Sequence, residues 1–351
     1  MAYTTVNKST DHFNTKLYTG NAGTNAITGV GFQPDWVWLK RRDGTGNHNL
    51  YDVVRGVTKY LESSSTAPEQ TQSYGLTAFG TDGFTLGSNT NMNGNGQSFV
   101  SWNWKAGNSS GSSNGNGSIT STVSANTTAG FSIVKWTGNG SAGATVGHGL
   151  GAVPRVIIVK NLTDNGTGFY TYAAPLGNTK GLFLHNDDAE ASFTSVWNST
   201  TPTNSVFTLG TNTGVNASSK NYVAYCFTNV TGYSKFDYYT GNANTDGTFV
   251  YTGFKPKFVI IKRYSDSGKW VMQDNKRSTA GGGNPNDDWL YANGNDAEYD
   301  ASSYPLDLVS NGFKIRHSSG SFQNNPDGAT YLYLAFGQTL VGSNNTPNTA
   351  R

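Results

Sequence analysis

Tyr18-Thr19-Gly20-Asn21 is the stretch that organises this chain, because it returns as Trp136-Thr137-Gly138-Asn139 and as Tyr239-Thr240-Gly241-Asn242. Each copy is followed by a second motif, which consists of a proline, one further residue, four apolar residues and a lysine. This motif ends at Lys40, Lys160 and Lys262, which lie 22 to 24 positions after the first residue of each copy. A pair of motifs repeated in this way indicates three similar units of roughly 100 residues each. No copy holds chemistry that the others lack, which argues against a single active site.

The segment before each lysine decides the fold class. Residues 36–39, 156–159 and 258–261 are all apolar, so a strand at each place is expected to be covered on both faces. The last strand of each copy alternates instead, as Trp102 and Trp104 do on one face of the first. Glycine, Asn, Ser and Thr fill the gaps between apolar runs, which is typical of turns. We expect an all-β protein of three tandem β-sandwich modules, of jelly-roll or lectin-like type.

The spacing of the repeats sets the expected domain boundaries. The first module covers residues 1–107, the second 131–233 and the third 234–338, and a polar C-terminal tail follows at 339–351. Residues 108–130 consist almost wholly of Gly, Ser, Asn and Thr, which is typical of a flexible linker. We therefore expect the second and third modules to abut, whereas the first stands apart from them.

Composition and charge exclude several classes of partner. The net charge is +2 and only 13% of the residues are charged, so no nucleic-acid partner is expected. The N-terminal residues contain no apolar core, which argues against a secretory signal peptide. No apolar run approaches the roughly 20 residues that a membrane-spanning helix needs, so no membrane insertion is expected. The single cysteine permits no internal disulfide.

The residue types that carry chemistry form no catalytic pattern. Cys226 aligns across the repeats with Asn103 and Ala335, which indicates a packing position. The sequence has no Gly-x-Ser-x-Gly motif and no phosphate-binding loop, and its five histidines show no metal-ligand spacing. The three repeated lysines either form an anion site in each copy or lay their stems on apolar surface with the ammonium groups in water. We expect no enzymatic activity and no cofactor.

Acidic residues recur after an apolar run in the second and third copies. Oxygen ligands on a loop can bind calcium, which takes six or more of them, and paired carboxylates can hydrolyse glycosides. The segments lack the alternating Asp, Asn and Gly residues of a known calcium loop, so a solvated turn is the competing interpretation. The weak calcium candidates are Asp187, Asp188, Glu190, Asp296 and Glu298.

Tryptophans supply the candidates for binding and for assembly. Trp197, Trp270 and Trp289 lie in the variable segments, where rings stack on sugars or on partner proteins unless they fill a core. Trp36 and Trp38 lie on a strand that needs cover on both faces. Because the first module stands apart on its linker, we expect one of these two rings to pack on another subunit or on another protein of the same assembly. That contact would contribute about 2–3 kcal/mol.

Short motifs beyond the repeat carry a family resemblance. They are the stretches 16–21, 31–40, 82–88 and 102–107, the elements Leu50-Tyr51-Asp52 and Arg55-Gly56, and the ending Thr349-Ala350-Arg351. Together they resemble a module that is common in virion proteins of marine tailed bacteriophages. The likeness is strongest over residues 1–107, and the two later copies lack the Leu-Tyr-Asp and Arg-Gly elements. Proteins of this kind are often labelled tail-fibre or structural, and the resemblance brings no catalytic residue with it.

The resemblance implies a component of a phage particle that is made in the host cytoplasm. We expect a non-enzymatic structural protein displayed on the virion surface, of tail-fibre or appendage type, which can also serve as a host-surface adhesin. A capsid decoration protein or head appendage is an alternative, because no heptad pattern indicates a trimeric stalk. An array of carbohydrate-binding modules is another alternative. The expected partners are other virion proteins, further copies of this chain and a host surface glycan.

Overall fold

The computed structural model describes residues 4–278, 283–318 and 324–338, and most of the regular structure in them is β-strand. The helical elements among these residues are single turns: α1 (Thr90–Asn93), α2 (Thr194–Trp197), α3 (Thr213–Asn216), η1 (Ser9–Asp11) and η2 (Ala174–Leu176). No helix in the described part of the chain is long and apolar enough to cross a membrane. The prediction of an all-β fold is confirmed. The predicted C-terminal tail, 339–351, lies outside the described residues.

The same order of four antiparallel strands occurs three times. The first sheet contains β1 (Phe13–Thr19), β9 (Ser98–Trp104), β3 (Trp36–Arg41) and β4 (Asn49–Asp52). The second contains β12 (Phe131–Thr137), β19 (Asn221–Phe227), β14 (Val156–Asn161) and β15 (Phe169–Ala173). The third contains β20 (Ser234–Thr240), β28 (Thr330–Gln338), β22 (Lys255–Arg263) and β23 (Trp270–Asp274). The strand that ends in the repeated lysine is therefore internal in each sheet.

Shorter strands complete the three repeats. The small sheets are β2 (Asn25–Ile27), β8 (Gly83–Leu86) and β7 (Leu76–Gly80); β13 (Ala144–Gly147) and β18 (Val206–Leu209); and β21 (Phe249–Tyr251), β27 (Gly312–Ile315) and β26 (Leu306–Val309). Edge strands extend the second and third large sheets: β16 (Lys180–Phe183), β17 (Ala191–Ser192), β24 (Asp288–Tyr291) and β25 (Tyr299–Asp300). In the first repeat β5 (Lys59–Tyr60) pairs with β6 (Gln70–Thr71).

Residues 108–130 are not a free linker, which corrects the expectation from their composition. Within them β10 (Ser112–Asn114) pairs with β11 (Ser121–Asn126), and β11 pairs with β12 at the edge of the second sheet. Val123 and Ile119 are buried in a core of the second repeat. These two apolar side chains give an otherwise polar segment a face to bury, and the sheet edge supplies its hydrogen bonds.

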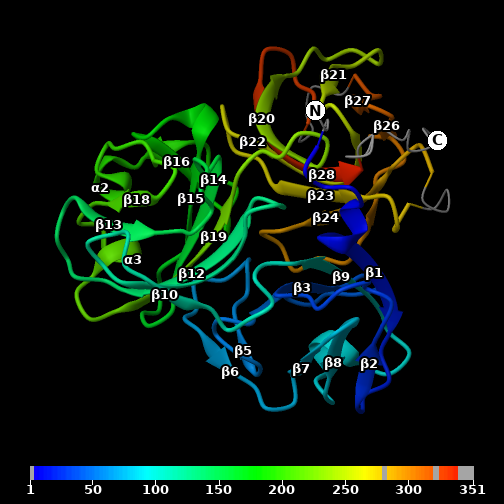
Figure 1. Cartoon of the computed structure of the whole chain (residues 1–351). Helices are drawn as coiled ribbons and strands as arrows, with labels where there is room; N and C mark the ends of the chain where they lie inside the picture. The colour runs from blue at the N-terminus through cyan, green and yellow to red at the C-terminus, as the bar shows by residue number, and fades with distance from the viewer. Residues whose placement is uncertain (1–3, 279–282, 319–323, 339–351) are drawn as a thin grey trace.

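One hydrophobic core lies where the three large sheets meet, and the three groups of strands surround it (Figure 1). Each internal strand contributes alternate residues to this common core: Trp36 and Trp38, Val156 and Ile158, Phe258 and Ile260. The intervening residues face the small sheet of their own repeat in three separate clusters: Val37 and Leu39, Ile157 and Val159, Val259 and Ile261. Both faces of β3, β14 and β22 are thus covered, as their four consecutive apolar residues predict.

Trp36 and Trp38 pack within the chain itself, so the predicted docking of the first module on another subunit is wrong. The two residues are 2% and 1% exposed. The Trp36 ring stacks on Tyr225 of the second repeat, with centroids 4.2 Å apart. The third repeat completes the contact through Phe258, whose ring lies 5.5 Å from Trp102. Because residues 108–130 fold onto the second sheet, they hold the first repeat against the other two rather than apart from them.

Close contact between the glycine and a neighbouring backbone explains why the Thr-Gly-Asn stretch recurs. A Cβ atom on any of its three glycines would lie within 2.4 Å of a backbone carbonyl oxygen. In each copy the next N–H donates to a buried asparagine side chain that holds the loop in place: Asn93, Asn216 and Asn325. The motif is therefore a site of close backbone approach rather than a sugar- or phosphate-binding loop.

Replacing Trp36 with alanine tests whether the repeats share one core. The change leaves a cavity at the junction of the sheets, so we expect the free energy of unfolding to fall by about 3–5 kcal/mol. Circular dichroism and tryptophan fluorescence should report one coincident denaturant transition, because the repeats lose their common core together. Tyr74→Ala is the control, since its side chain is 53% exposed and its loss should cost about 0.5 kcal/mol or less. Two separate transitions would contradict a shared core.

Candidate functional site

The three tryptophans named as candidates for binding sugars or partner proteins are all buried, so they fill cores, which was the competing interpretation. Trp197, Trp270 and Trp289 are each 1% exposed or less. Trp197 packs edge-on against Tyr172 in the second repeat. The Trp270 indole lies in the common core and donates to the carbonyl oxygen of Phe183 at 3.0 Å. A position on a variable segment is thus no guide to exposure here, because the three rings fill three different cores: Trp197 that of the second repeat, Trp270 the common core, and Trp289 a small cluster with Val271 and Ala301.

The five carboxylates predicted as weak calcium ligands do not gather into a site. Within the described residues, no group of three or more His, Cys, Asp or Glu side chains is placed to hold a metal ion. Glu298 binds Arg42 at 2.6 Å and Arg277 at 2.8 Å. The others have separate partners: Glu190 with Lys180, Asp296 with Lys269, Asp188 with Asn186, and the Asp187 carbonyl with Lys262. The carboxylates of Glu190, Glu298, Asp188 and Asp296 are thus engaged by protein donors, whereas Asp187 contributes only its backbone carbonyl oxygen.

These acidic segments instead join one repeat to the next. The carbonyl oxygen two residues after each repeated lysine accepts a hydrogen bond from the backbone N–H of a glutamate in another repeat. The three bonds run from Glu298 to Arg42, from Glu190 to Tyr264 and from Glu69 to Leu162, at 2.7, 2.9 and 3.1 Å. Glu69, which stands far from the other acidic residues of its repeat in sequence, is therefore the counterpart of Glu190 and Glu298.

A buried ion pair marks the interface between the first and second repeats. The Asp52 carboxylate, at the end of β4, accepts the backbone N–H groups of Val54 and Arg55 and binds the Arg55 guanidinium. The Tyr225 hydroxyl of the second repeat donates to the same carboxylate at 2.8 Å. Burial disfavours the charged guanidinium, but Asp52 holds the pKa of Arg55 above its usual value. This carboxylate thus binds two repeats together.

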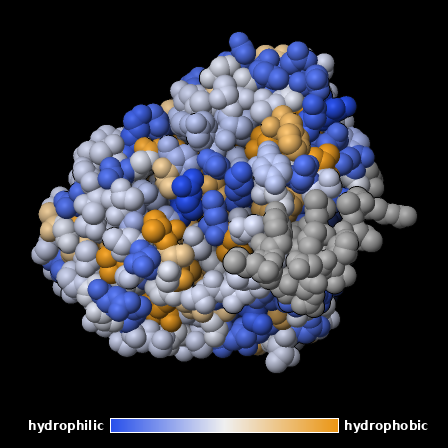
Figure 2. Space-filling model, turned by 45° about the horizontal axis from the view of Figure 1, so that its top comes forward, coloured by the Kyte–Doolittle hydropathy of each residue, from blue (hydrophilic) through white to orange (hydrophobic). Residues whose placement is uncertain are grey.

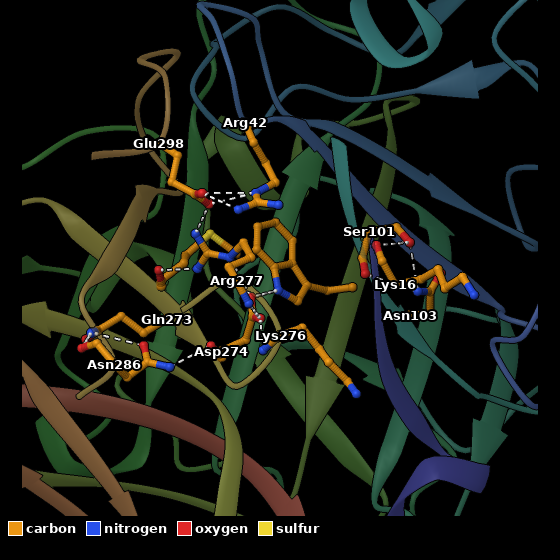
Figure 3. A network of polar contacts seen from close by, with 12 residues as sticks. Lys16, Arg42, Ser101, Asn103, Gln273, Asp274, Lys276, Arg277, Asn286 and Glu298 are labelled. Atoms are coloured by element: carbon orange, nitrogen blue, oxygen red, sulfur yellow. Dashed lines mark hydrogen bonds and ion pairs between the residues drawn. The ribbon is translucent and has the colours of Figure 1, made fainter. Parts of the chain in front are cut away.

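The third repeat contains the same arrangement, which aligning the three repeats by their motifs did not reveal. Asp274 accepts the N–H groups of Lys276 and Arg277 and binds the Arg277 guanidinium at 2.6 Å. Trp102 of the first repeat donates its indole N–H to Asp274 at 2.9 Å. Figure 3 shows Arg277 between Asp274 and Glu298, with Arg42 on the far side of Glu298. The two repeats share the spacing Asp-x-x-Arg, and this spacing was the signal available in the sequence. It was hard to recognise because Gln273 precedes Asp274, whereas Tyr51 precedes Asp52.

At the interface between the second and third repeats, apolar residues stand where the other two interfaces have a carboxylate and its hydrogen-bond donor. The strand register identifies Ala173 as the counterpart of Asp52 and Asp274. Each of these three residues pairs with the first core residue of the internal strand in its own repeat. The counterpart of Tyr225 and Trp102 is likewise Leu334. Ala173 and Leu334 both lie in the common core. A buried carboxylate and its donor are therefore present together or absent together, which avoids an unpaired buried charge.

The repeated lysines are neither anion sites nor side chains that extend into water. Lys40, Lys160 and Lys262 are at most 1% exposed. Each ammonium group donates to a backbone carbonyl oxygen: Lys40 to that of Arg41, the last residue of β3, and Lys160 and Lys262 to those of Thr167 and Gly268 in nearby loops. Burial lowers the pKa of each lysine to about 8. Their common role is to satisfy carbonyl groups where the internal strand ends.

An open depression of about 300 Å³ is lined by Asp288, a buried carboxylate whose pKa is raised. Burial and then Glu298 raise the pKa of Asp288 to about 6, and its Oδ2 atom has no hydrogen-bond partner among the described residues. A glycosidase would need a second, free carboxylate nearby. Three other carboxylates line the depression. Glu298 is bound by Arg42 and Arg277, Asp43 is bound by Arg41, and Asp300 accepts the backbone N–H of Ser302.

Exposed aromatic side chains lie instead on the third repeat. Phe249 and Tyr251 alternate with the buried Val250 on β21 and are 44% and 56% exposed. Tyr251 borders an open depression of about 270 Å³ with hydroxyl and amide groups around it. The Lys235 ammonium donates to the Tyr251 carbonyl oxygen and lies 5.5 Å from its ring centroid. A ring with polar neighbours is the arrangement that binds a sugar face, and a three-residue strand gave little sequence signal for it.

The surface around such groups is mixed rather than continuous. Figure 2 shows apolar residues as small groups scattered among polar ones on the face in view. The other large exposed apolar side chains of the described residues are spread over the three repeats: Val57 and Tyr74 in the first, Val153 in the second, and Tyr238 and Tyr299 in the third. The Tyr251 depression is therefore the candidate binding site that geometry supports best.

The structure defines an all-β protein whose three sheets close around one core. The chain belongs to the family described as Domain of unknown function (DUF7483), whose profile matches residues 8–339. That match runs through all three repeats. No curated protein matches the chain, and no solved structure matches it either.

Replacing Asp274 with alanine tests the ion pair between the first and third repeats. The change removes the carboxylate that binds the buried Arg277 guanidinium within the same turn. We therefore expect a loss of about 3–5 kcal/mol in the free energy of unfolding. The double change Asp274→Ala with Arg277→Leu should recover part of that loss, since it imitates the apolar interface. Asp266→Ala is the control, because its ion pair with Arg263 is exposed and worth less than about 1 kcal/mol. Equal losses for Asp274→Ala and Asp266→Ala would refute the argument.

Proposed function

We propose that this chain is a non-enzymatic structural protein of a phage particle, displayed on the particle surface in a tail fibre or a similar appendage. The observation that carries the structural role is the common core, which joins three repeats into one body. The assignment to a phage rests on the resemblance of residues 1–107 to virion proteins. Capsid decoration uses the same properties and is distinguished by location on the particle.

The use of the polar side chains supports this role. Asp52, Asp274 and Glu298 are the kinds of groups that enzymes employ, yet each is bound by arginine between strands or repeats. Buried ion pairs of this kind fix one arrangement of the repeats, because every alternative leaves a charge unpaired. A protein that must keep its shape while its outer loops contact a partner benefits from such fixation.

Mass spectrometry of purified phage particles tests the proposal. We expect this chain at many copies per particle after washing in high salt, with the amount unchanged by further washes. Separation of tails from capsids before digestion then distinguishes an appendage from a capsid decoration protein. Recovery of the chain only in the host lysate, and not with washed particles, would refute a structural role.

A glycan-binding role is the second candidate, and the depression at Tyr251 is the observation that favours it. The ring of Tyr251 is open to solvent, and Asn229, Thr231 and Thr252 surround it with amide and hydroxyl groups. Binding at one such shallow site would be weak, and many copies on a particle would raise the overall affinity. This role and the structural role can hold together.

Binding of the purified chain to host-surface polysaccharide tests the second role. Tyr251→Ala should weaken binding about 3- to 10-fold, because a stacked ring contributes about 0.5–1.5 kcal/mol beyond its buried area. Tyr74→Ala is the matched control, since Tyr74 is 53% exposed but lies on the first repeat. Equal binding by the parent and Tyr251→Ala proteins would exclude this depression as the site.

A further inference from the structure

A partly enclosed cavity of about 150 Å³ lies between the first and third repeats. Its walls come from β1, which supplies Phe13 and Thr15, and from the third repeat, which supplies Lys257 and Lys276. Asn275 also lines it, from the turn that follows β23. The cavity therefore lies at the interface between these two repeats, which the hydrogen bond from Trp102 to Asp274 also joins.

The two lysines of the cavity have no acidic partner among the described residues. The Lys257 ammonium donates to the Ser9 hydroxyl at 3.0 Å. Figure 3 shows the Lys276 side chain extending away from Arg277 and Glu298. Burial, then the charges of Lys276 and Lys8, lower the pKa of Lys257 to about 8. Lys257 thus lies near a second cation, the exposed Lys276, whereas the ammonium groups of the three repeated lysines bind carbonyl oxygens.

The backbone directs Lys257 to this position. The pairing of β22 with β28 shifts register between Pro256 and Phe258, so Lys257 stands at a β-bulge. Its counterparts Asp35 and Arg155 precede the strands of the other two repeats. Bulges commonly redirect one side chain at a functional position, and here the redirected side chain faces the cavity.

A buried hydroxyl group completes the set of donors. Thr15 is 6% exposed and lines the cavity, and its Oγ1 atom has no hydrogen-bond partner in the described part of the structure. Leaving such a group unpaired destabilises the folded chain. An acceptor in the cavity would satisfy it.

We propose that this cavity binds a tetrahedral oxyanion, phosphate or sulfate, between Lys257, Lys276 and Thr15. The three donors come from three different elements and meet at one small space, which suits a group with oxygens in several directions. Lysine serves as a point charge toward such anions. The occupant is either the free ion or the same group on a small ester. This site does not depend on the proposed role in a phage particle, because it is built into the seam between repeats.

Thermal unfolding with and without the anion tests the proposal. A ligand that binds only the folded chain raises its stability with concentration. We expect sodium phosphate and sodium sulfate to raise the unfolding midpoint more than sodium chloride at equal ionic strength, and calorimetric titration to give a saturable single site. Glucose 6-phosphate and glucose 6-sulfate should bind as tightly as the ions if the ester is the natural source, and more weakly if the free ion is.

The variants Lys257→Met and Lys276→Met should each weaken phosphate binding at least 10-fold, and the double variant should abolish the specific rise in midpoint. Without the anion, the Lys257→Met protein loses both the repulsion by Lys276 and the hydrogen bond to Ser9, so each variant's response is measured as the phosphate-dependent rise above its own midpoint. A lost response would then not reflect unfolding. Lys135→Met is the control, since this partly exposed lysine on β12 lies outside the cavity. The inference is overturned if the double variant keeps the phosphate response, if chloride matches phosphate, or if acetate binds as tightly as phosphate.

Discussion

A strand with two apolar faces is the constraint on which the rest of this structure depends. Residues 36–39, 156–159 and 258–261 present apolar side chains on both sides, so one sheet packed on one partner cannot bury them. The small sheet of each repeat covers one side, and the other two repeats cover the other. The smallest arrangement that satisfies all three strands within one chain places the sheets around a common centre.

The polar contacts make that arrangement specific. Hydrophobic packing alone would tolerate several relative placements of three similar sheets, because burial of apolar area has no direction. The buried pairs Asp52–Arg55 and Asp274–Arg277 each need one particular donor, Tyr225 or Trp102, from one particular neighbour. Exchanging two repeats would place a carboxylate against Leu334 and leave it without that donor. The cyclic order of the repeats is thus encoded in a few side chains.

Local sequence patterns predicted the strands and the fold class but not how the repeats contact one another. Alternation and apolar runs reveal which faces of a strand are buried, and these expectations agree with the burial of β3, β14 and β22. The Gly- and Ser-rich composition of residues 108–130 suggested flexibility, whereas Val123 and a free sheet edge were enough to order β11. The buried tryptophans and the engaged carboxylates were misjudged for a related reason. For Trp270 and Glu298 the partners come from segments more than 80 residues away, Phe183 and Arg42 respectively, and no local period records that distance.

The first and last parts of the described chain lie in contact, which makes a circular permutation of the gene feasible. The backbone N–H and the hydroxyl of Ser9 both donate to the side-chain oxygen of Gln338, at 2.9 and 2.8 Å. A third contact, from Lys257 to Ser9, ties the same corner. The repeats therefore form a ring that lacks only one covalent connection. Opening the chain at Gly115, where space is free, and joining these ends would preserve all three sheets, so a circularly permuted gene should specify the same molecule.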